Sequence, residues 1–189
     1  WHEQPAMAWW EALVDAVRAA LEGRSELASR IAAVCLAPQR ETFVPVGLDG
    51  TPLRHAIVWM DERAGALLPE IAAECDTDRV HAATGKPLSG NLSLVKLLWL
   101  RRHEPDTYAG IHKVLDVAGF LNHKLTGRYA TGWGCVDPMG LFDMRTKAWD
   151  AQLLDYLRLD VAQMPEAAAP GTVIGSVTQG AADACGLRA

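Results

Sequence analysis

The spacing of apolar residues predicts a helix near the beginning of the sequence, over residues 5–21. Apolar side chains recur there every three or four positions, which places them on one helix face. Pro5 suits the first turn of such a helix, and Gly23 is typical of the position just past its end. The apolar positions are Trp10, Leu13, Val14, Val17 and Leu21.

Three short apolar runs follow, and each predicts a strand. They cover residues 31–37, 42–48 and 56–60, and the first and third are almost wholly apolar, as in strands buried on both faces. Asp49-Gly50, after the second run, predicts a tight turn. Two strands joined in this way form an antiparallel hairpin, so we expect a mixed sheet.

The rest of the chain alternates helices with short strands. A late strand is expected over 171–177 and a short one at 114–115, whereas the glycine-rich stretch 129–143 predicts a loop or bent hairpin. Strands mixed with helices indicate an α/β layer fold. The helical patterns cover residues 62–74, 78–83, 93–103, 117–125 and 151–159, and a last short helix ends at Gly186.

Composition excludes several classes of protein. The 189 residues are 50% hydrophobic and 22% charged, with a formal net charge of -5, so binding to nucleic acid through phosphate neutralisation is not expected. No apolar run is long enough to span a membrane, and no secretory leader is seen. Four cysteines lie far apart without metal-ligand spacing. We therefore expect free thiols, no metal site and a cytoplasmic location.

The string Gln39-Arg40-Glu41-Thr42 is the strongest candidate for a binding site. It follows the buried run 31–37, and ligands of open α/β sheets bind at the carboxyl ends of strands. A guanidinium offers a planar fork of donors and a carboxylate offers acceptors, a combination that suits a ligand rich in hydroxyl groups. The alternative is an exposed charge pair in a tight turn.

Four other side chains have a structural interpretation, and three of them have a functional one as well. Asp61 either caps the next helix or lies, with Arg63, near the same cleft. Asn91 either caps a helix or hydrogen-bonds a ligand hydroxyl, and Lys96 is expected on a solvated helix face. Trp133, flanked by glycines, either stacks on a sugar ring or anchors its loop to the core.

Several common catalytic motifs are absent from the sequence. It contains no Walker phosphate loop, no dinucleotide-binding glycine fingerprint and no nucleophile elbow. The six histidines do not pair at metal-ligand spacing. The residues alone therefore predict an α/β domain with a polar cleft for a polyol.

The order of several short blocks resembles the FGGY family of carbohydrate kinases over nearly the whole chain. Each block is weak alone, but their succession is specific. The blocks are Trp9-Trp10, the Gln39–Thr42 string, Asp49-Gly50-Thr51-Pro52-Leu53, Ala56-Ile57-Val58-Trp59, Thr84-Gly85, Ser93 with Lys96-Leu97-Leu98-Trp99-Leu100, Glu104-Pro105, Leu125-Thr126-Gly127, Asp137 with Gly140, and Asp143-Met144-Arg145-Thr146-Lys147-Ala148-Trp149.

This resemblance implies an RNase H-like lobe, as in actin and hexokinase, and transfer of the γ-phosphoryl group of ATP to a sugar or polyol with Mg²⁺. It implies that Arg40 and Glu41 grip substrate hydroxyls, with Gln39, Asp61 and Asn91 as further substrate-binding candidates. Glycerol kinases carry the same Gln-Arg-Glu-Thr string and xylulokinases usually Met-His at positions 40 and 41. Glycerol kinases place an aromatic residue near this position, where the present chain has Asn91. The resemblance therefore does not single out glycerol, and a ketopentose or another polyol fits equally well.

The resemblance also implies that residues 1–189 are an incomplete N-terminal lobe. The family's Asp-x-Gly-Thr phosphate-binding turn, its catalytic Asp and its ATP-binding lobe are expected outside these residues, and we expect the chain alone to be inactive. Two alternatives are a non-catalytic sugar-binding or regulatory module and an assembly fragment whose tryptophans cover a partner. A homodimer is left open.

Overall fold

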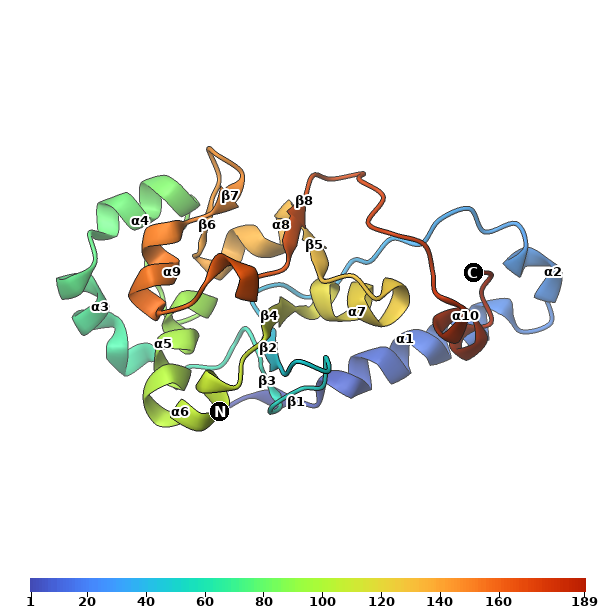
Figure 1. The fold of residues 1–189 in the computed structure, drawn as a ribbon, viewed down its shortest axis with the longest axis horizontal. Coiled ribbons are helices and arrows are strands. Elements are labelled where there is room, and N and C mark those ends of the chain that lie inside the picture. Colours follow the sequence, from blue (N-terminus) through green and yellow to red (C-terminus); the bar gives the residue numbers. More distant parts are fainter.

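The computed structural model describes residues 1–189, apart from the side chain of residue 25. The molecule is elongated, with most helices gathered at one end and a long helix extending toward the other (Figure 1). In chain order the elements are β1 (Glu3–Gln4), α1 (Ala6–Leu21), α2 (Ser25–Ala28), β2 (Phe43–Val46), β3 (Ala56–Ile57), η1 (Gly65–Leu67), α3 (Leu68–Glu74), α4 (Thr77–Thr84), α5 (Ser93–His103), α6 (Pro105–Ala109), β4 (Lys113–Asp116), α7 (Val117–Thr126), β5 (Ala130–Gly132), α8 (Trp133–Val136), η2 (Asp137–Met139), β6 (Phe142–Asp143), β7 (Ala148–Trp149), α9 (Ala151–Leu157), η3 (Val161–Gln163), β8 (Glu166–Ala168) and α10 (Gln179–Cys185).

A four-stranded sheet with the order β1-β3-β2-β4 lies at the centre of the molecule. All three of its pairings are antiparallel. The predicted turn at Asp49-Gly50 is present: Gly50 has a φ of 77°, which favours glycine, and its N–H donates to the carbonyl of Gly47. A parallel pairing joins β5 to β8 in a separate two-stranded sheet. The α/β class is therefore confirmed, but this central sheet is antiparallel rather than mixed.

The larger part of the molecule, which we call the body, consists of this sheet with α3–α6, α8 and α9. Its central helix is α5, whose residues 93–100 are all buried. Apart from Ser93 and Lys96 these residues are apolar, and a helix that is apolar on every side is typical of a core. The prediction of a helix over residues 93–103 is confirmed, and Pro105 begins the next helix as expected.

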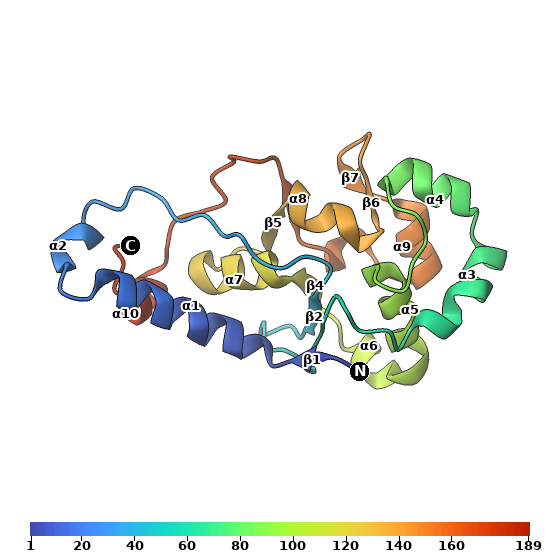
Figure 2. The same ribbon diagram turned by 180° about the vertical axis from the view of Figure 1, so that it is seen from behind.

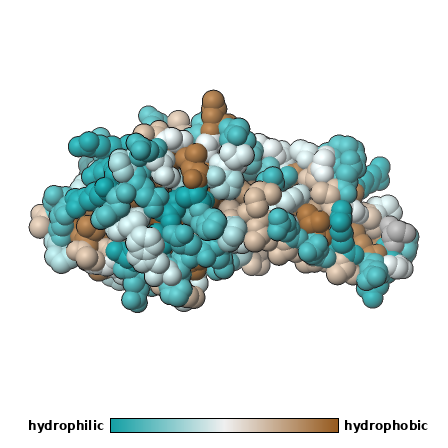
Figure 3. Space-filling view, turned by 90° about the horizontal axis from the view of Figure 1, so that it is seen from below, coloured by the Kyte–Doolittle hydropathy of each residue, from teal (hydrophilic) through white to brown (hydrophobic). Residues whose placement is uncertain are grey.

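The narrow end of the molecule, which we call the arm, consists of α1, α2 and α10 (Figure 2). The predicted helix over 5–21 is confirmed, but of the residues of α1 only Ala6 is buried. The apolar stripe of α1 is half-buried against a small cluster around Leu125, Ala181 and Cys185. The space-filling view shows apolar side chains at the surface of this narrow end (Figure 3).

Helix α7 connects the arm to the sheet. Asp116, at the end of β4, caps it by accepting hydrogen bonds from the N–H groups of Ala118 and Gly119, at 3.1 and 3.2 Å. A Cβ atom at Gly119 would lie 2.9 Å from the Asp116 carboxylate, so glycine is required for this cap. Burial raises the pKa of Asp116, although the hydrogen bond from Thr131 opposes that shift.

Two predicted strands are wrong. Residues 31–37 form extended coil, with Ile31 and Val34 exposed by 40% and 42%. Residues 171–177 also form coil, and the late strand is β8 instead. An apolar run becomes a strand only where a neighbouring strand supplies hydrogen-bond partners, and neither run has one among the residues that the structure describes.

Other elements differ in their bounds or in detail. The helix expected over residues 62–74 begins only at η1, and the strand expected over 56–60 ends at Ile57. The stretch 129–143, predicted as a loop or bent hairpin, contains β5, α8, η2 and β6. No helix within the described chain is both long and apolar enough to cross a membrane.

Candidate polyol-binding site

A shallow pocket of about 430 Å³ lies immediately before β2. The predicted residues Gln39, Arg40 and Glu41 line it, together with Pro38 and Trp59. The string therefore faces a concavity, as expected, but not at the expected place. It lies at the amino end of β2 rather than at the carboxyl end of a strand over residues 31–37.

Local backbone geometry fixes Glu41. Its φ of 64° lies in the left-handed region, which costs a residue with a side chain about 1–2 kcal/mol. The hydroxyl of Ser93, at the start of α5, donates to the Glu41 carbonyl at 3.2 Å. Thr42 is buried, and its hydroxyl accepts the backbone N–H of Trp59 at 3.0 Å. The two sides of the pocket are thus joined directly behind its lining.

Arg40 lies at the rim of the pocket with 48% of its side chain exposed. One guanidinium nitrogen donates to the carbonyl of Gly134 and to Asp137 Oδ1, each at 3.0 Å. The other Asp137 oxygen lies 3.2 Å from Lys86 Nζ. One carboxylate therefore pairs with two cations and holds one edge of the Arg40 guanidinium, while the other nitrogens of Arg40 remain available.

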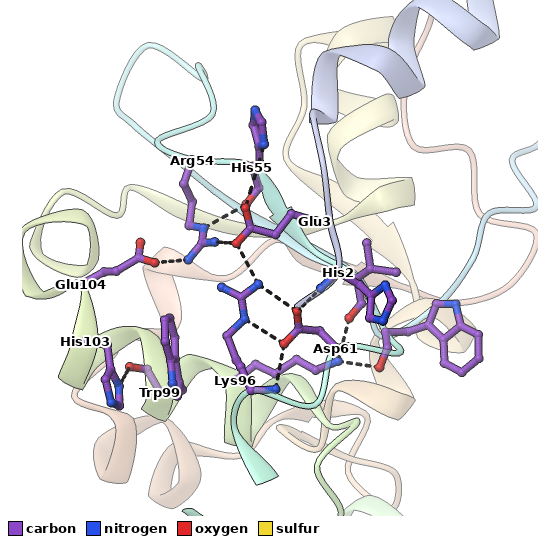
Figure 4. A network of polar contacts seen from close by, with 12 residues as sticks. His2, Glu3, Arg54, His55, Asp61, Lys96, Trp99, His103 and Glu104 are labelled. Atoms are coloured by element: carbon purple, nitrogen blue, oxygen red, sulfur yellow. Dashed lines mark hydrogen bonds and ion pairs between the residues drawn. The ribbon is translucent and has the colours of Figure 1, made fainter. Parts of the chain in front are cut away.

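Asp61 does not line the pocket. Its side chain is fully buried and accepts hydrogen bonds from Nε and an NH2 nitrogen of Arg63, both at 2.8 Å, and from the N–H of His2 (Figure 4). Burial by itself would raise the pKa of Asp61, but these hydrogen bonds outweigh it and hold the pKa well below its ordinary value. Its expected role as a helix cap is wrong, because no helix begins after it before Gly65.

The partners of Arg63 extend this buried network. Its guanidinium lies 2.7 Å from Glu3, and Glu3 also pairs with Arg54, which pairs with Glu104 (Figure 4). The Arg63 guanidinium also stacks 5.0 Å from the ring of Trp99. These contacts join β1, the segments on either side of β3, and α5.

Lys96 is a residue that the sequence analysis placed wrongly. It is fully buried, and its ammonium group donates to the carbonyls of Val58 at 3.0 Å and Trp59 at 2.7 Å. Burial lowers the pKa of Lys96 to about 8, although the negative charges of Asp61 and Glu41 oppose that shift. The apolar residues on every side of it were the signal for a buried position.

Asn91 and Trp133 are not among the residues that line the pocket. Asn91 is exposed two residues before Ser93, and the alternative that it caps α5 is wrong, because Leu92 occupies the N-cap position. Trp133 packs against the core and donates from Nε1 to the carbonyl of Ala167 at 3.2 Å. The interpretation of Trp133 as a loop anchor is therefore confirmed.

The pocket residues do not fit a nucleotide triphosphate. Arg40 is the one cation among the residues that line it, and Glu41 beside it would repel phosphate. Within the described part of the chain, no three His, Cys, Asp or Glu side chains gather as metal ligands. The donors and acceptors of the pocket match a neutral molecule with several hydroxyl groups.

Comparisons with known proteins define the class. The chain belongs to the FGGY family of carbohydrate kinases, because the model of the family's N-terminal domain matches residues 1–189. It is 31% identical to a xylulose kinase from Streptomyces coelicolor over 91% of its length, and 33% identical to a glycerol kinase from Gloeobacter violaceus over 87%. It spans 35% and 33% of those two relatives, about a third of their length.

The solved structures agree with this assignment. The crystal structure of a xyloylose kinase from Brucella ovis matches all of this chain and 38% of that one, with a TM-score of 0.92 and 27% identity. The fold expected from the resemblance, an α/β N-terminal lobe of a sugar kinase, is therefore confirmed. The family consists of phosphotransferases that act on carbohydrates.

Proposed function

We propose that this chain forms one wall of the substrate site in a kinase that phosphorylates a hydroxyl of a sugar or small polyol. The observation that carries this proposal is the shared pocket of Gln39, Arg40, Glu41 and Trp59. Arg40 would donate to substrate oxygens and Glu41 would accept from substrate hydroxyls, while the Trp59 ring, 39% exposed, would cover an apolar face of the substrate.

ATP with Mg²⁺ would supply the phosphoryl group, and we assign no residue of this chain to it. The task of these residues is to bind and orient the acceptor hydroxyl, a contribution that positions the reacting atoms. Asp61 and Asn91 stay predictions as substrate-binding residues, although neither lines the pocket. The cytoplasmic location stays a prediction, and a homodimer stays an open alternative.

The test is phosphorylation of D-xylulose, glycerol and related polyols by the complete polypeptide that carries these residues. Arg40→Ala should raise KM for the accepted polyol at least tenfold and leave KM for ATP within twofold. Arg102→Ala, which removes a surface arginine of α5 paired with Glu70, is the matched control and should change neither. An equal rise of both constants for Arg40→Ala would contradict the binding role.

A second candidate function is a sugar-binding or regulatory module without transfer. It would use the same pocket, whose lining offers groups for a polyol and needs no ATP for binding. Calorimetry separates the two functions, because this module would bind a polyol without consuming ATP. Transfer of phosphate to any polyol of the panel rejects it.

A further inference from the structure

The first turn of α5 contacts both walls of the pocket from behind. Ser93 and Lys96 are three positions apart and share one helix face. The Ser93 hydroxyl donates to the carbonyl of Glu41, and the Lys96 ammonium donates to the carbonyl of Trp59. One rigid helical turn thus holds a backbone group from each wall.

A third contact closes the arrangement into a ring. The N–H of Trp59 donates to the hydroxyl of Thr42, the residue after Glu41. Both polar groups of the Trp59 backbone are therefore engaged, its N–H by the opposite wall and its carbonyl by α5. Trp59 and Glu41 both line the pocket, and 39% of Trp59 is exposed.

Burial of the Lys96 ammonium group costs free energy unless hydrogen bonds replace its lost hydration. An ammonium group that is fully buried loses its hydration, and apolar side chains surround it on α5. Two carbonyls from consecutive residues, Val58 and Trp59, compensate for that loss. Both carbonyls must turn inward to reach it, which fixes the course of the backbone just past β3. Figure 4 shows Lys96 beside Asp61, at the inner end of the ion-pair network.

We infer that Ser93 and Lys96 are positioning residues that set the separation of the Glu41 and Trp59 walls and thereby the affinity for the polyol. This inference rests on the proposed function. Neither residue lines the pocket, so each acts on it indirectly: Ser93 through the Glu41 carbonyl, and Lys96 through the Val58 and Trp59 carbonyls and through its charge near Glu41.

The kinetic test compares Lys96→Met with Lys96→Gln in the complete polypeptide, with D-xylulose and glycerol as the polyols. Lys96→Met removes the donors and should raise KM for the polyol at least tenfold, with KM for ATP within twofold. Lys96→Gln keeps an amide with two N–H donors, so its KM should lie between those of Lys96→Met and wild type. Ser93→Ala should raise KM about threefold by freeing the Glu41 carbonyl.

Leu97→Ala is the control for general destabilisation. Leu97 is the next residue on α5, is fully buried and lies outside the pocket lining, so its truncation should lower stability without changing either KM. A folded Lys96→Met protein with an unchanged polyol KM overturns the inference, and so does a Leu97→Ala protein with the same polyol effect. If wild type uses no polyol at all, the proposed function fails instead.

A spectroscopic measurement tests the positioning without any substrate. In the complete polypeptide labelled with 5-fluorotryptophan, comparison with Trp59→Phe assigns the ¹⁹F resonance of Trp59 among those of all its tryptophans, seven of which lie in residues 1–189. Lys96→Met should shift and broaden that resonance, whereas Leu97→Ala should leave it in place. A Trp59 resonance that is identical in wild type and Lys96→Met contradicts the inference, even if the kinase assay detects no phosphorylation.

Discussion

The body and the arm each contain one helix rich in apolar residues, and the two helices differ in how much of their surface is buried. In α5 residues 93–100 are all buried, including a serine and a lysine, whereas in α1 only Ala6 is buried. Helical spacing predicted both helices. What it does not predict is how much of each apolar surface another element covers.

Polar groups are distributed between the two regions in the same unequal way. Fully buried ionic groups occur in the body, where Asp61, Arg63 and Lys96 meet around the end of β3. In the arm, the charged side chains of α1 are exposed. Buried ions require fixed partners, whereas exposed ones exchange theirs with water. The body is therefore the region in which substitution of one charge should affect both stability and the pocket.

The largest expected effect comes from Asp61→Asn. In the variant, the fully buried Arg63 guanidinium keeps Glu3 as its charged partner but loses Asp61. Removal of one partner from a buried ion pair lowers the free energy of unfolding by about 3–5 kcal/mol. Urea unfolding followed by tryptophan fluorescence measures the loss. The matched control is Glu166→Gln, which breaks the exposed pair with Arg128 and should cost at most about 1 kcal/mol.

Acidification should reproduce part of that loss in wild type. The pKa of Asp61 in the folded chain lies below its ordinary value, so its contribution is present above about pH 4 and disappears as the pH falls further. Asp61→Asn removes this pH dependence. Equal stability of Asp61→Asn and Glu166→Gln at neutral pH would contradict the distinction drawn between buried and exposed ion pairs.

A pair of leucine truncations tests the hydrophobic half of the comparison. Leu97→Ala in α5 empties a fully buried site and should cost about 2–5 kcal/mol, whereas Leu13→Ala in α1 removes a half-buried side chain and should cost about 1 kcal/mol. Both substitutions replace leucine by alanine within a helix, so helix propensity cancels. Similar losses in urea unfolding would show that the arm is packed as firmly as the body.

The sequence predicted individual elements better than their surroundings. It placed α5, α7 and the hairpin turn at Gly50 within a residue or two, because caps, glycines and periodicity are local signals. It failed for residues 31–37, because strand formation depends on a partner that local pattern does not reveal.

The candidate site shows the same division. The string at Gln39, Arg40 and Glu41 was recognised from its chemistry, and these residues do line one pocket. Lys96 was assigned to a solvated face because lysine is usually exposed, although its apolar neighbours indicated burial. The Arg40–Asp137 contact joins residues 97 positions apart, and no single-sequence pattern reveals a pairing at that distance.

A pH titration of stability should reveal Lys96. Its pKa of about 8 in the folded chain lies below the ordinary 10.5, so between these values the unfolded chain binds more protons. The free energy of unfolding should therefore gain up to ~3 kcal/mol from this residue as pH rises from 8 to 10.5. The groups that face Lys96 are Asp61 and Glu41, whose charges oppose the shift, and Arg63, whose charge favours it.

The difference between wild type and Lys96→Met isolates this titration. Buried thiols such as Cys135, whose pKa burial raises to about 11, have the opposite effect in the same range but titrate in both proteins. Lys124→Met, which removes a half-buried lysine of α7, is the control and should follow wild type. If the stability curves of wild type and Lys96→Met run parallel between pH 8 and 10.5, the lowered pKa of Lys96 is contradicted.

The smallest expected effect lies where the coil from the arm meets the body. Residues 29–42 lead from α2 to β2, and Arg40 attaches this coil to the body through Gly134 and Asp137. Asp137→Asn keeps an acceptor oxygen but removes the charge. Because the Arg40 side chain is about half exposed, we expect a loss of about 1 kcal/mol, which corresponds to a roughly fivefold higher KM for the polyol.

A double-variant cycle decides whether Asp137 acts through Arg40. If it does, Arg40→Ala combined with Asp137→Asn should be no worse than Arg40→Ala alone, because the group that Asp137 orients is already gone. Asp183→Asn in α10, an exposed acidic residue of the arm, should leave KM unchanged. A lower KM for Asp137→Asn would reverse the interpretation: the carboxylate would then compete with substrate for the guanidinium, and the same contact that secures the coil would keep the pocket partly closed.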